Sequence, residues 1–573
     1  MDHHLSGVQR RQVEQEYLRN GIPSIILAVV TIVLTAYSFW YVQPNIESHY
    51  RQICDNNFQK LGLTPLLSSC EDGTRTEASS EKEKLSPDIS RSLMTDTQLC
   101  LRRLSIREPK NDLIRFEMGV VAIALEEWYR ERAWDTATSE AKSDEINMYL
   151  ARQKDEIGNA VSSMRVVMQM KGPLAARAAG WIVEINLRNS HFYVGELDEL
   201  QAILQGHLNN PEPKFEDSQR SGSVKDKAVL KSLLARIATI RATIPDIHIR
   251  DSDRLQWLGQ ASESFTSADR KDLLTQSWRA FAELPINRDR AQDWAWGAVQ
   301  DFWTQGIVVR PTSEMLDAVF RGLLIGGNFE EAQSFVFNHL KKIPSFEQSR
   351  LRELAAATCL RQLVMSHLIE LSSETVKAKT GAVKLDETSD IASNFILLDL
   401  AVRLQPEAPG LPELLIALTS TSSEENQFSL ANFMLQIIDS SPREGLAGIL
   451  EAIRMAKSDD SSGVAKAIAK VTQDDIAYGV LATKVAMILS NTKFNKSTVG
   501  DKSRVNIDHQ TVIQWLRSIN DGSPELFSAW FARGSLHLNA MEFDQAIECF
   551  EFLAKRLPDN EQVQEMLVAA RVR

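Results

Sequence analysis

The sequence predicts an all-α protein, an α-solenoid of paired helices preceded by one transmembrane helix. Apolar residues recur three and four positions apart over most of the chain, which is the period of an amphipathic helix. The two-residue alternation typical of strands is almost absent. An uncharged run of residues lies near the N-terminus. Many helices with short connections favour a solenoid over a compact bundle.

Composition excludes several classes of protein. A chain of 573 residues indicates several domains or one long array of repeats. With 43% hydrophobic and 24% charged residues, the chain is not globally disordered. The net charge is −12 and no long basic block occurs, so we expect no nucleic-acid binding. Five cysteines without a C-x-x-C pair predict no disulfide framework.

The uncharged run covers residues 22–42 and predicts a transmembrane helix, because about 20 apolar residues cross the hydrocarbon core of a bilayer. Its C-terminal end is crowded with aromatic residues, as in an interfacial belt: Tyr37, Phe39, Trp40 and Tyr41. A cleaved signal peptide is the alternative, since residues 36–38 loosely match a cleavage site.

The charges that flank this run indicate its orientation. Arg10, Arg11 and Arg19 precede it, whereas Arg51 and Lys60 follow it. The excess of positive charge lies on the cytoplasmic side of a membrane helix. We therefore expect a single-pass membrane protein with a cytoplasmic N-terminus and an extracytoplasmic helical part, rather than the reverse.

Polar breaks divide the chain into segments. Residues 68–92 are rich in Ser, Glu and Lys and predict a solvated linker. The predicted segments are an N-terminal tail (1–21), the transmembrane helix (22–42), a juxtamembrane segment with the polar linker (43–92), three helical regions (93–210, 228–373 and 391–490), and a C-terminal region (507–573).

The clearest motif lies near the C-terminus. Its aromatic, small and proline positions are Trp530, Gly534, Phe543, Ala546, Phe550 and Pro558. With these residues, the segment 527–560 closely resembles a tetratricopeptide repeat. A weaker copy at 313–345 keeps the spacing of Phe329, Ala332 and Pro344, but has Phe320 where the family has glycine. The two alanines are not separated by a multiple of the 34-residue period, so the array is interrupted or degenerate.

Each position of the stronger motif has a physical reason. Small residues at Gly534 and Ala546 allow two helices to approach where they cross, and Pro558 ends the second helix. Residues 523–525, Ser-Pro-Glu, predict the start of the first helix. Residues 561–572 predict a final helix that caps the last apolar face.

The resemblance implies a partner groove lined by the first helix of each pair. In the C-terminal repeat the candidate groove residues are Ser528, Phe531, Ser535, Leu538 and Asn539. In the earlier repeat they are Glu314, Asp317, Arg321, Leu324 and Ile325. Some of these residues could instead pack against a neighbouring helix. The family's lysine and asparagine clamp for a chaperone tail is not reproduced, which argues against a receptor of that kind.

Tryptophans are concentrated in residues 278–303. Trp296 and Trp303 are seven positions apart and therefore share one helical face. The face is either an aromatic binding groove or part of a packed core.

No catalytic motif is found: the phosphate loop, the dinucleotide fingerprint, the zinc-protease motif and the nucleophile elbow are all missing. We expect no enzyme, with no catalytic or metal residues and no cofactor. The predicted function is a membrane-tethered scaffold for protein partners. The alternatives are a structural subunit of a stable membrane complex and an enzyme with a dispersed active site.

Overall fold

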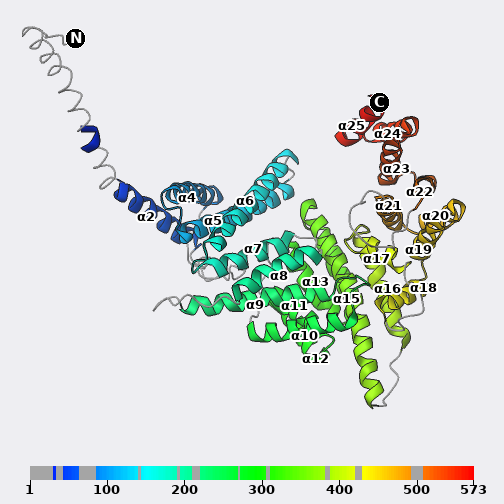
Figure 1. The fold of residues 1–573 in the computed structure, drawn as a ribbon, viewed down its shortest axis with the longest axis horizontal. Coiled ribbons are helices and arrows are strands. Elements are labelled where there is room, and N and C mark those ends of the chain that lie inside the picture. Colours follow the sequence, from blue (N-terminus) through cyan, green and yellow to red (C-terminus); the bar gives the residue numbers. More distant parts are fainter. Residues whose placement is uncertain are drawn as a thin grey trace, which may run out of the picture. The chain divides into compact units, whose positions relative to one another are not determined.

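The computed structural model describes residues 30–33, 43–63, 86–139, 143–189, 194–208, 220–268, 272–304, 310–380, 387–419, 429–491 and 507–572. These residues form helices joined by turns and contain no strand, which confirms the all-α prediction (Figure 1). The chain divides into two compact units. Unit 1 comprises Met1–Ile185 and Pro211–Asp226, and unit 2 comprises Asn186–Asn210 and Lys227–Arg573.

The predicted transmembrane helix at 22–42 requires correction. Among the described residues, no helix is long and apolar enough to cross a membrane. A span needs about 20 consecutive apolar residues, whereas long helices here, such as α5 (Asp112–Thr138), carry charges along their length. Apart from residues 30–33, the segment 22–42 lies outside the described residues. The anchor, the single-pass membrane localisation and its orientation are therefore not retained.

Unit 1 contains α2 (Gln43–Leu61), α4 (Pro87–Arg107), α5, α6 (Ser143–Met170) and the first part of α7 (Ala175–Asn189). Within it α2 packs on α4, α4 on α5 and α5 on α6. Arg51 on α2 pairs with the buried Glu117 on α5 at 2.6 Å. The Ser86 hydroxyl accepts the Ile89 N–H and caps α4, so this helix begins inside the predicted linker.

Unit 2 takes α9 (Arg220–Ala242) from Lys227 onward. It also holds the other helices: α8 (Val194–Leu208), α10 (Asp251–Ala268), α11 (Leu273–Glu283), α12 (Arg288–Thr304), α13 (Ser313–Ile325), α14 (Phe329–Leu340), α15 (Ser345–Thr380), α16 (Glu387–Leu404), α17 (Leu411–Leu418), α18 (Leu430–Asp439), α19 (Glu444–Lys457), α20 (Ser461–Asp474), α21 (Ile476–Asn491), α22 (His509–Gly522), α23 (Phe527–Asn539), α24 (Phe543–Arg556) and α25 (Glu561–Val572). Successive helices form hairpins, as in α11 with α12 and α19 with α20. The unit is a helical-repeat arrangement.

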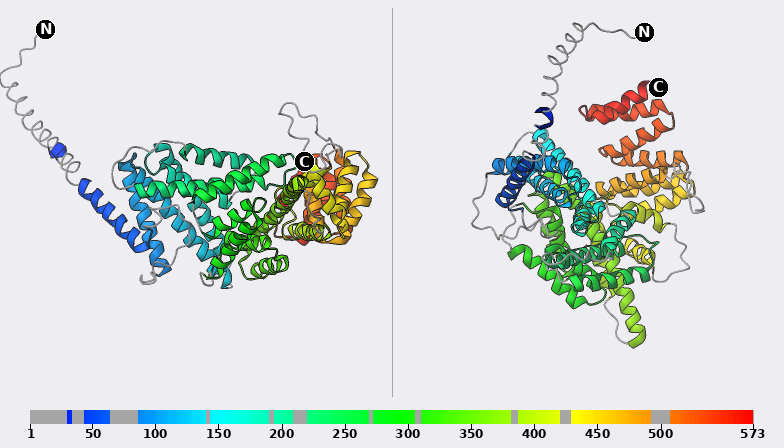
Figure 2. Two further views of the ribbon diagram at one scale, coloured as in Figure 1. Left: turned by 90° about the horizontal axis from the view of Figure 1, so that it is seen from below. Right: turned by 60° about the vertical axis from the view of Figure 1, so that its left-hand side comes forward.

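The C-terminal helices α22 to α25 stack in sequence order (Figure 2). The α23–α24 hairpin lies within the predicted repeat, residues 527–560, and the final helix α25 has the predicted boundaries. The predicted need for a small residue at the helix crossing is confirmed, because a Cβ at Gly534 would lie 2.9 Å from the Phe550 ring and 3.0 Å from Cys549. Ala546 and Phe550 are fully buried at this crossing.

One local prediction was wrong. Ser523 does not start α23, because its N–H bonds to the Ile519 carbonyl and ends α22 instead. In the earlier hairpin, the small residue at a close crossing is Gly322. A Cβ there would lie 2.9 Å from the Ala295 carbonyl oxygen. Helix α13 therefore approaches α12 most closely through a glycine that the repeat pattern did not mark.

Candidate functional site

The candidate groove residues on α23 are divided between surface and core. Ser528 and Asn539 are exposed. Phe531 is half-buried, with its ring 5.8 Å from that of Phe550, and Leu538 packs on the same core. The Ser535 hydroxyl donates to the Phe531 carbonyl at 2.8 Å. A partner role for this face stays a prediction.

The candidate residues on α13 are mostly inside the fold. Asp317 and Arg321 are each 2% exposed and form an ion pair. Leu324 and Ile325 are also buried. Helices α11, α12 and α15 pack around α13 and cover the face that the repeat pattern assigned to an open groove. These residues serve packing in this structure, which was the alternative reading, and Glu314 contributes a weak ion pair to Arg188 at 3.9 Å.

The buried pair belongs to a polar cluster around Trp278. Arg321 lies 3.7 Å from the centroid of the Trp278 ring and donates to the Ser277 hydroxyl at 2.8 Å. Thr358 donates to Asp317 at 2.7 Å. Arg361 lies 5.5 Å from the same ring. Burial, together with the charge of Arg321, lowers the pKa of Arg361 to about 9. The cluster thus concentrates positive charge inside unit 2, with Asp317 as a central counter-charge.

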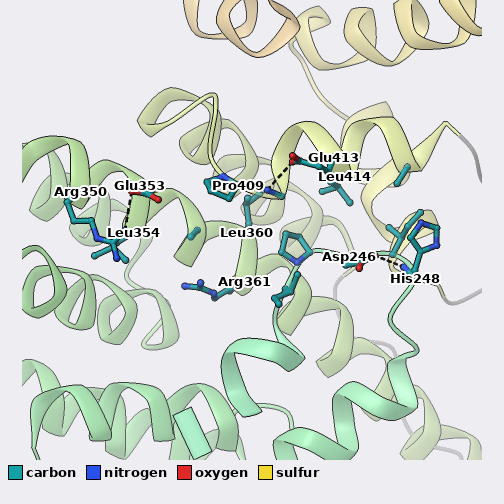
Figure 3. Close-up of a pocket in the computed structure, with 16 residues that line it drawn as sticks. Asp246, His248, Arg350, Glu353, Leu354, Leu360, Arg361, Pro409, Glu413 and Leu414 are labelled. Atoms are coloured by element: carbon teal, nitrogen blue, oxygen red, sulfur yellow. Dashed lines mark hydrogen bonds and ion pairs between the residues drawn. The ribbon is translucent and has the colours of Figure 1, made fainter. Parts of the chain in front are cut away.

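A cavity of about 350 Å³ opens beside this cluster (Figure 3). Three segments form its walls: the loop between α9 and α10, the middle of α15, and the turn between α16 and α17. Most of the lining side chains are apolar: Ile244, Pro245, Ile247, Leu354, Ala357, Leu360, Pro409, Leu414 and Ala417. The volume lies in the range of about 300–1,000 Å³ that is usual for ligand sites.

Polar side chains stand at opposite ends of the cavity (Figure 3). At one end, Arg350 donates to Glu353 at 3.1 Å and to the Arg188 carbonyl at 2.5 Å. At the other end, the His248 N–H donates to the Asp246 carboxylate at 2.9 Å. Glu413 accepts the Gly410 N–H at 3.1 Å and so closes the first turn of α17. These contacts give the carboxylates structural roles.

Arg254 holds the loop that forms one wall. It is fully buried on α10 and donates to the carbonyls of Ala242 at 2.6 Å and Ile244 at 2.7 Å, and to that of Asp246. These carbonyls follow the C-terminus of α9, where helix hydrogen bonding ends. Burial lowers the pKa of Arg254 to about 10 despite nearby Asp251.

A glycine allows the opposite wall to approach. Gly410 has φ +91°, a conformation that side chains other than glycine rarely adopt. A Cβ at this position would also lie 3.1 Å from the Pro245 ring. Gly410 therefore serves both the turn before α17 and the close contact between the two loops.

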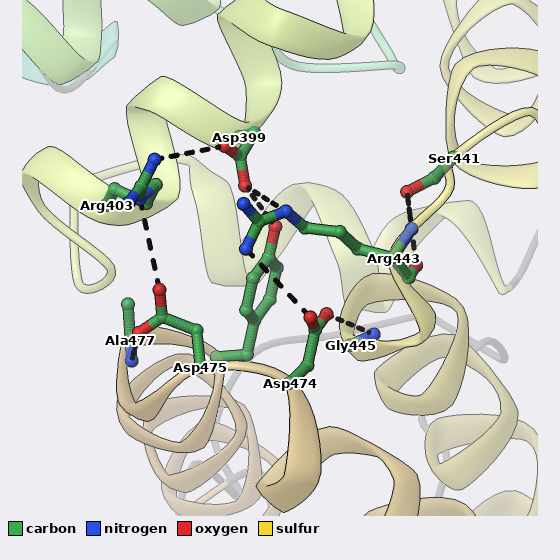
Figure 4. Close-up of polar contacts among 9 residues, drawn as sticks. Asp399, Arg403, Ser441, Arg443, Gly445, Asp474, Asp475 and Ala477 are labelled. Atoms are coloured by element: carbon green, nitrogen blue, oxygen red, sulfur yellow. Dashed lines mark hydrogen bonds and ion pairs between the residues drawn. The ribbon is translucent and has the colours of Figure 1, made fainter.

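A second polar network joins the helices that follow the cavity (Figure 4). The Tyr478 hydroxyl on α21 donates to Asp399 on α16 at 2.7 Å. Arg443 lies 3.3 Å from Asp399 and 3.9 Å from Asp474. Arg403 lies 3.9 Å from Asp475. The network joins α16, the start of α19, the end of α20 and α21 through charge-assisted contacts.

We expect Tyr478→Phe to lower the free energy of unfolding of unit 2 by about 2 kcal/mol, because a buried hydrogen bond to a charged group is lost. Urea unfolding followed by circular dichroism measures the change. Ser458→Ala is the control, since that hydroxyl donates to the Arg454 carbonyl at an exposed site of the same unit, and we expect a change below about 0.5 kcal/mol. Equal effects for the two variants would contradict a special role for the network.

The cavity was not predicted from the sequence. Its walls come from three segments that are far apart in the sequence, residues 244–248, 350–361 and 409–417, and only punctuating residues such as Pro245, Pro409 and Gly410 marked the loops. The described residues include no group of three His, Cys, Asp or Glu side chains that could hold a metal ion.

Comparisons with known proteins leave the family unassigned. No family model matches the chain, and no curated protein matches it. Among solved structures, the chain is similar to "Circular tandem repeat protein with novel repeat topology and enhanced subunit contact surfaces", at 13% identity and a TM-score of 0.18, over 92% of this chain and 95% of that one. It is also similar to "Structure of Naa15/Naa10 bound to HypK-THB", at 13% identity and a TM-score of 0.17, over 84% and 94%. At these scores, neither likeness carries an argument about function.

Proposed function

We propose that this protein is a non-catalytic helical scaffold that binds an apolar peptide segment of a partner protein in the cavity of unit 2. The observation that carries the proposal is the cavity itself, which is open enough for a ligand and lined mainly by aliphatic side chains. Each aliphatic side chain that a partner buries there contributes about 1.5–3 kcal/mol. The resemblance of residues 313–345 and 527–560 to tetratricopeptide repeats supports a binding role, because such arrays are usually scaffolds.

The distribution of polar groups favours a peptide over a small polar metabolite. The Arg350–Glu353 pair stands at one end, and Asp246 and His248 stand at the other, with leucines between them (Figure 3). A peptide that crosses the cavity presents backbone N–H and C=O groups at both ends and side chains in the middle. Donors and acceptors at the ends and apolar walls between them match that pattern.

The ionisable side chains that line the cavity already have structural partners, which supports a non-catalytic role. Glu413 caps a helix, Glu353 is held by Arg350, and Asp246 accepts a backbone N–H. A general base needs a geometry in which it reaches a substrate proton. Side chains that already hold backbone and arginine groups are better suited to shaping a binding site.

We expect Ala357→Trp to weaken peptide binding strongly, because the indole fills the cavity from α15. Peptides selected by display on the purified full chain serve as probes, and their affinity is measured by fluorescence anisotropy. The expected loss is tenfold or more, about 1.4 kcal/mol. Ser349→Trp is the control, because it adds the same side chain at an exposed position on the same helix.

Two results would oppose the proposal. One is the selection of peptides whose affinity is the same for the native chain and for Ala357→Trp. The other is that no peptide is selected, while an apolar small molecule binds to the native chain but not to the Ala357→Trp variant. The second result would keep the cavity as a ligand site but remove the partner protein.

A further inference from the structure

The outer face of α12 is unusual for a surface helix. Residues at three- and four-residue spacing form an exposed stripe: Asp289, Asp293, Trp296, Gln300 and Trp303. The opposite face of the helix holds its buried residues: Ala291, Ala295, Ala298 and Phe302. A helix in a globular protein normally carries polar residues on the face opposite the core. Here that face carries two tryptophans, 56% and 60% exposed.

The core interpretation of these tryptophans is therefore wrong, although it holds for Trp278, which is 2% exposed. The Trp303 ring makes T-shaped contacts with Phe302 and Phe335, with ring centroids 5.4 and 6.3 Å away. These two rings hold its orientation. Trp296 and Trp303 are about 10 Å apart along the helix axis, from the rise of 1.5 Å per residue. Together they present a two-ring surface. Tryptophans are the residues most often found at the energetic centres of interfaces.

Several other tryptophans of this protein are covered by arginines. Within the described residues, an arginine lies over the ring of each of five tryptophans: Trp128 (Arg91, 5.3 Å), Trp257 (Arg241, 4.6 Å), Trp278 (Arg321, 3.7 Å), Trp294 (Arg279, 3.9 Å) and Trp530 (Arg533, 4.5 Å). The face of an indole attracts a cation more strongly than other aromatic rings do. The exposed rings on α12 offer the same kind of surface to an outside cation.

The charges on the stripe point to the same kind of occupant. Asp289 and Asp293 are exposed and precede the tryptophans along the helix. Asp289 lies in the first turn, where an acid also stabilises the helix dipole, but Asp293 lies beyond that turn. Arg288 and Arg290 beside Asp289 are also exposed, but Arg290 lies 3.5 Å from the buried Glu283, which offsets its charge. The chain has a net charge of −12, which disfavours a second copy or an anionic surface as the occupant.

We infer that this stripe on α12 docks a basic peptide segment of a partner protein, with arginine or lysine side chains over Trp296 and Trp303 and further basic groups beside Asp289 and Asp293. The surface is separate from the cavity, and the inference does not depend on the function proposed for it. Cations spaced seven residues apart on a helix, or about three residues apart on an extended chain, match the distance of about 10 Å between the rings.

The test uses a synthetic alanine-rich helical peptide with arginines seven positions apart, added to the full-length chain. Two matched peptides replace arginine with citrulline, which has the same shape without the charge, and with glutamate. Affinity is measured by quenching of tryptophan fluorescence and by calorimetry. We expect the arginine peptide to bind at least about fivefold more tightly than the citrulline peptide, and the glutamate peptide not to bind.

Variants of the chain locate the site. Trp296→Gln should weaken binding of the arginine peptide at least about fivefold. The variant should still fold, because this ring is largely exposed. The double variant Asp289→Asn with Asp293→Asn should weaken binding of this peptide less, and should make the binding less dependent on salt. Ile396→Ala, which removes an exposed apolar side chain on α16, is the control and should change nothing. Ala357→Trp should also leave this binding intact, which separates the stripe from the cavity.

Three outcomes would overturn the inference. The first is equal affinity for the arginine and citrulline peptides, or binding that Trp296→Gln leaves unchanged. The second is a dimer of the native chain in light scattering that Trp296→Gln converts to a monomer, because the occupant would then be a second copy. The third is sedimentation of the native chain, but not of Trp296→Gln, with neutral phosphatidylcholine vesicles, because the stripe would then meet lipid.

Discussion

Replacing Asp317 by alanine is expected to cost about 3–5 kcal/mol of the free energy of unfolding of unit 2, because it leaves a buried guanidinium without its carboxylate. Arg321 is 2% exposed, and burial already lowers its pKa. Arg236 lies within 5.7 Å of the same Trp278 ring, so the cluster loses a central counter-charge. Thr358 also loses the acceptor of its hydroxyl. Urea unfolding of the purified chain measures the change.

A double-mutant cycle separates the charge from the packing. Arg321→Met removes the cation but keeps a long side chain against Trp278. If the unpaired charge causes the loss, Asp317→Ala combined with Arg321→Met is less damaging than the sum of the two single changes, by about 2 kcal/mol or more. Asp317→Asn is the control for shape and should cost less than alanine. Additive effects would show that Asp317 acts through packing alone.

The same cluster shows where sequence reasoning failed. Asp317 and Arg321 are spaced four apart on α13, and a charged pair at that spacing is commonly a solvated helix face. Whether such a face is solvated depends on which helices pack over it. Here α11 and α15 cover it, and the spacing of residues on α13 does not show which neighbouring helices will pack on that face. Local spacing identified the helix but not its environment.

For the α12 stripe, too, sequence spacing did not predict the surroundings of a helix face, but here the face is exposed rather than buried. The spacing of Trp296 and Trp303 established that they share a face, but not whether that face meets the core or the solvent. By contrast, the boundaries of α24 and α25 were predictable, since a turn, a proline and helix periodicity are local signals. Ser523 shows how such a signal misleads, because a residue suited to start one helix can end the previous one.

The cavity could not be predicted for a related reason. It depends on Arg254, which sits in an ordinary helical pattern and acts on carbonyls 8 to 12 residues earlier in the chain. An arginine in α10 would normally be expected on the surface. Only the fold reveals that its guanidinium occupies the loop after α9 and shapes a wall of the cavity.

Arg254→Met is therefore expected to affect both stability and binding. The change leaves the carbonyls of Ala242, Ile244 and Asp246 without their donor. Each unsatisfied buried acceptor costs about 1–3 kcal/mol, and water reaches some of them once the loop moves, so we expect a total loss of about 3 kcal/mol. Because the loop carries Ile244 and Pro245, peptide affinity at the cavity should fall together with stability.

The matched control is Arg250→Met, which removes an exposed arginine near the end of the same loop. We expect it to change the free energy of unfolding by less than about 0.5 kcal/mol and to leave peptide affinity unchanged. Urea unfolding and fluorescence anisotropy with the selected peptides measure the two quantities. A loss of stability in Arg254→Met with full peptide affinity at a temperature where the variant is folded would show that the loop does not shape the binding wall. Equal effects of Arg250→Met and Arg254→Met would show that the three carbonyl contacts contribute little, and that the loop keeps its conformation through Pro245 and Gly410 instead.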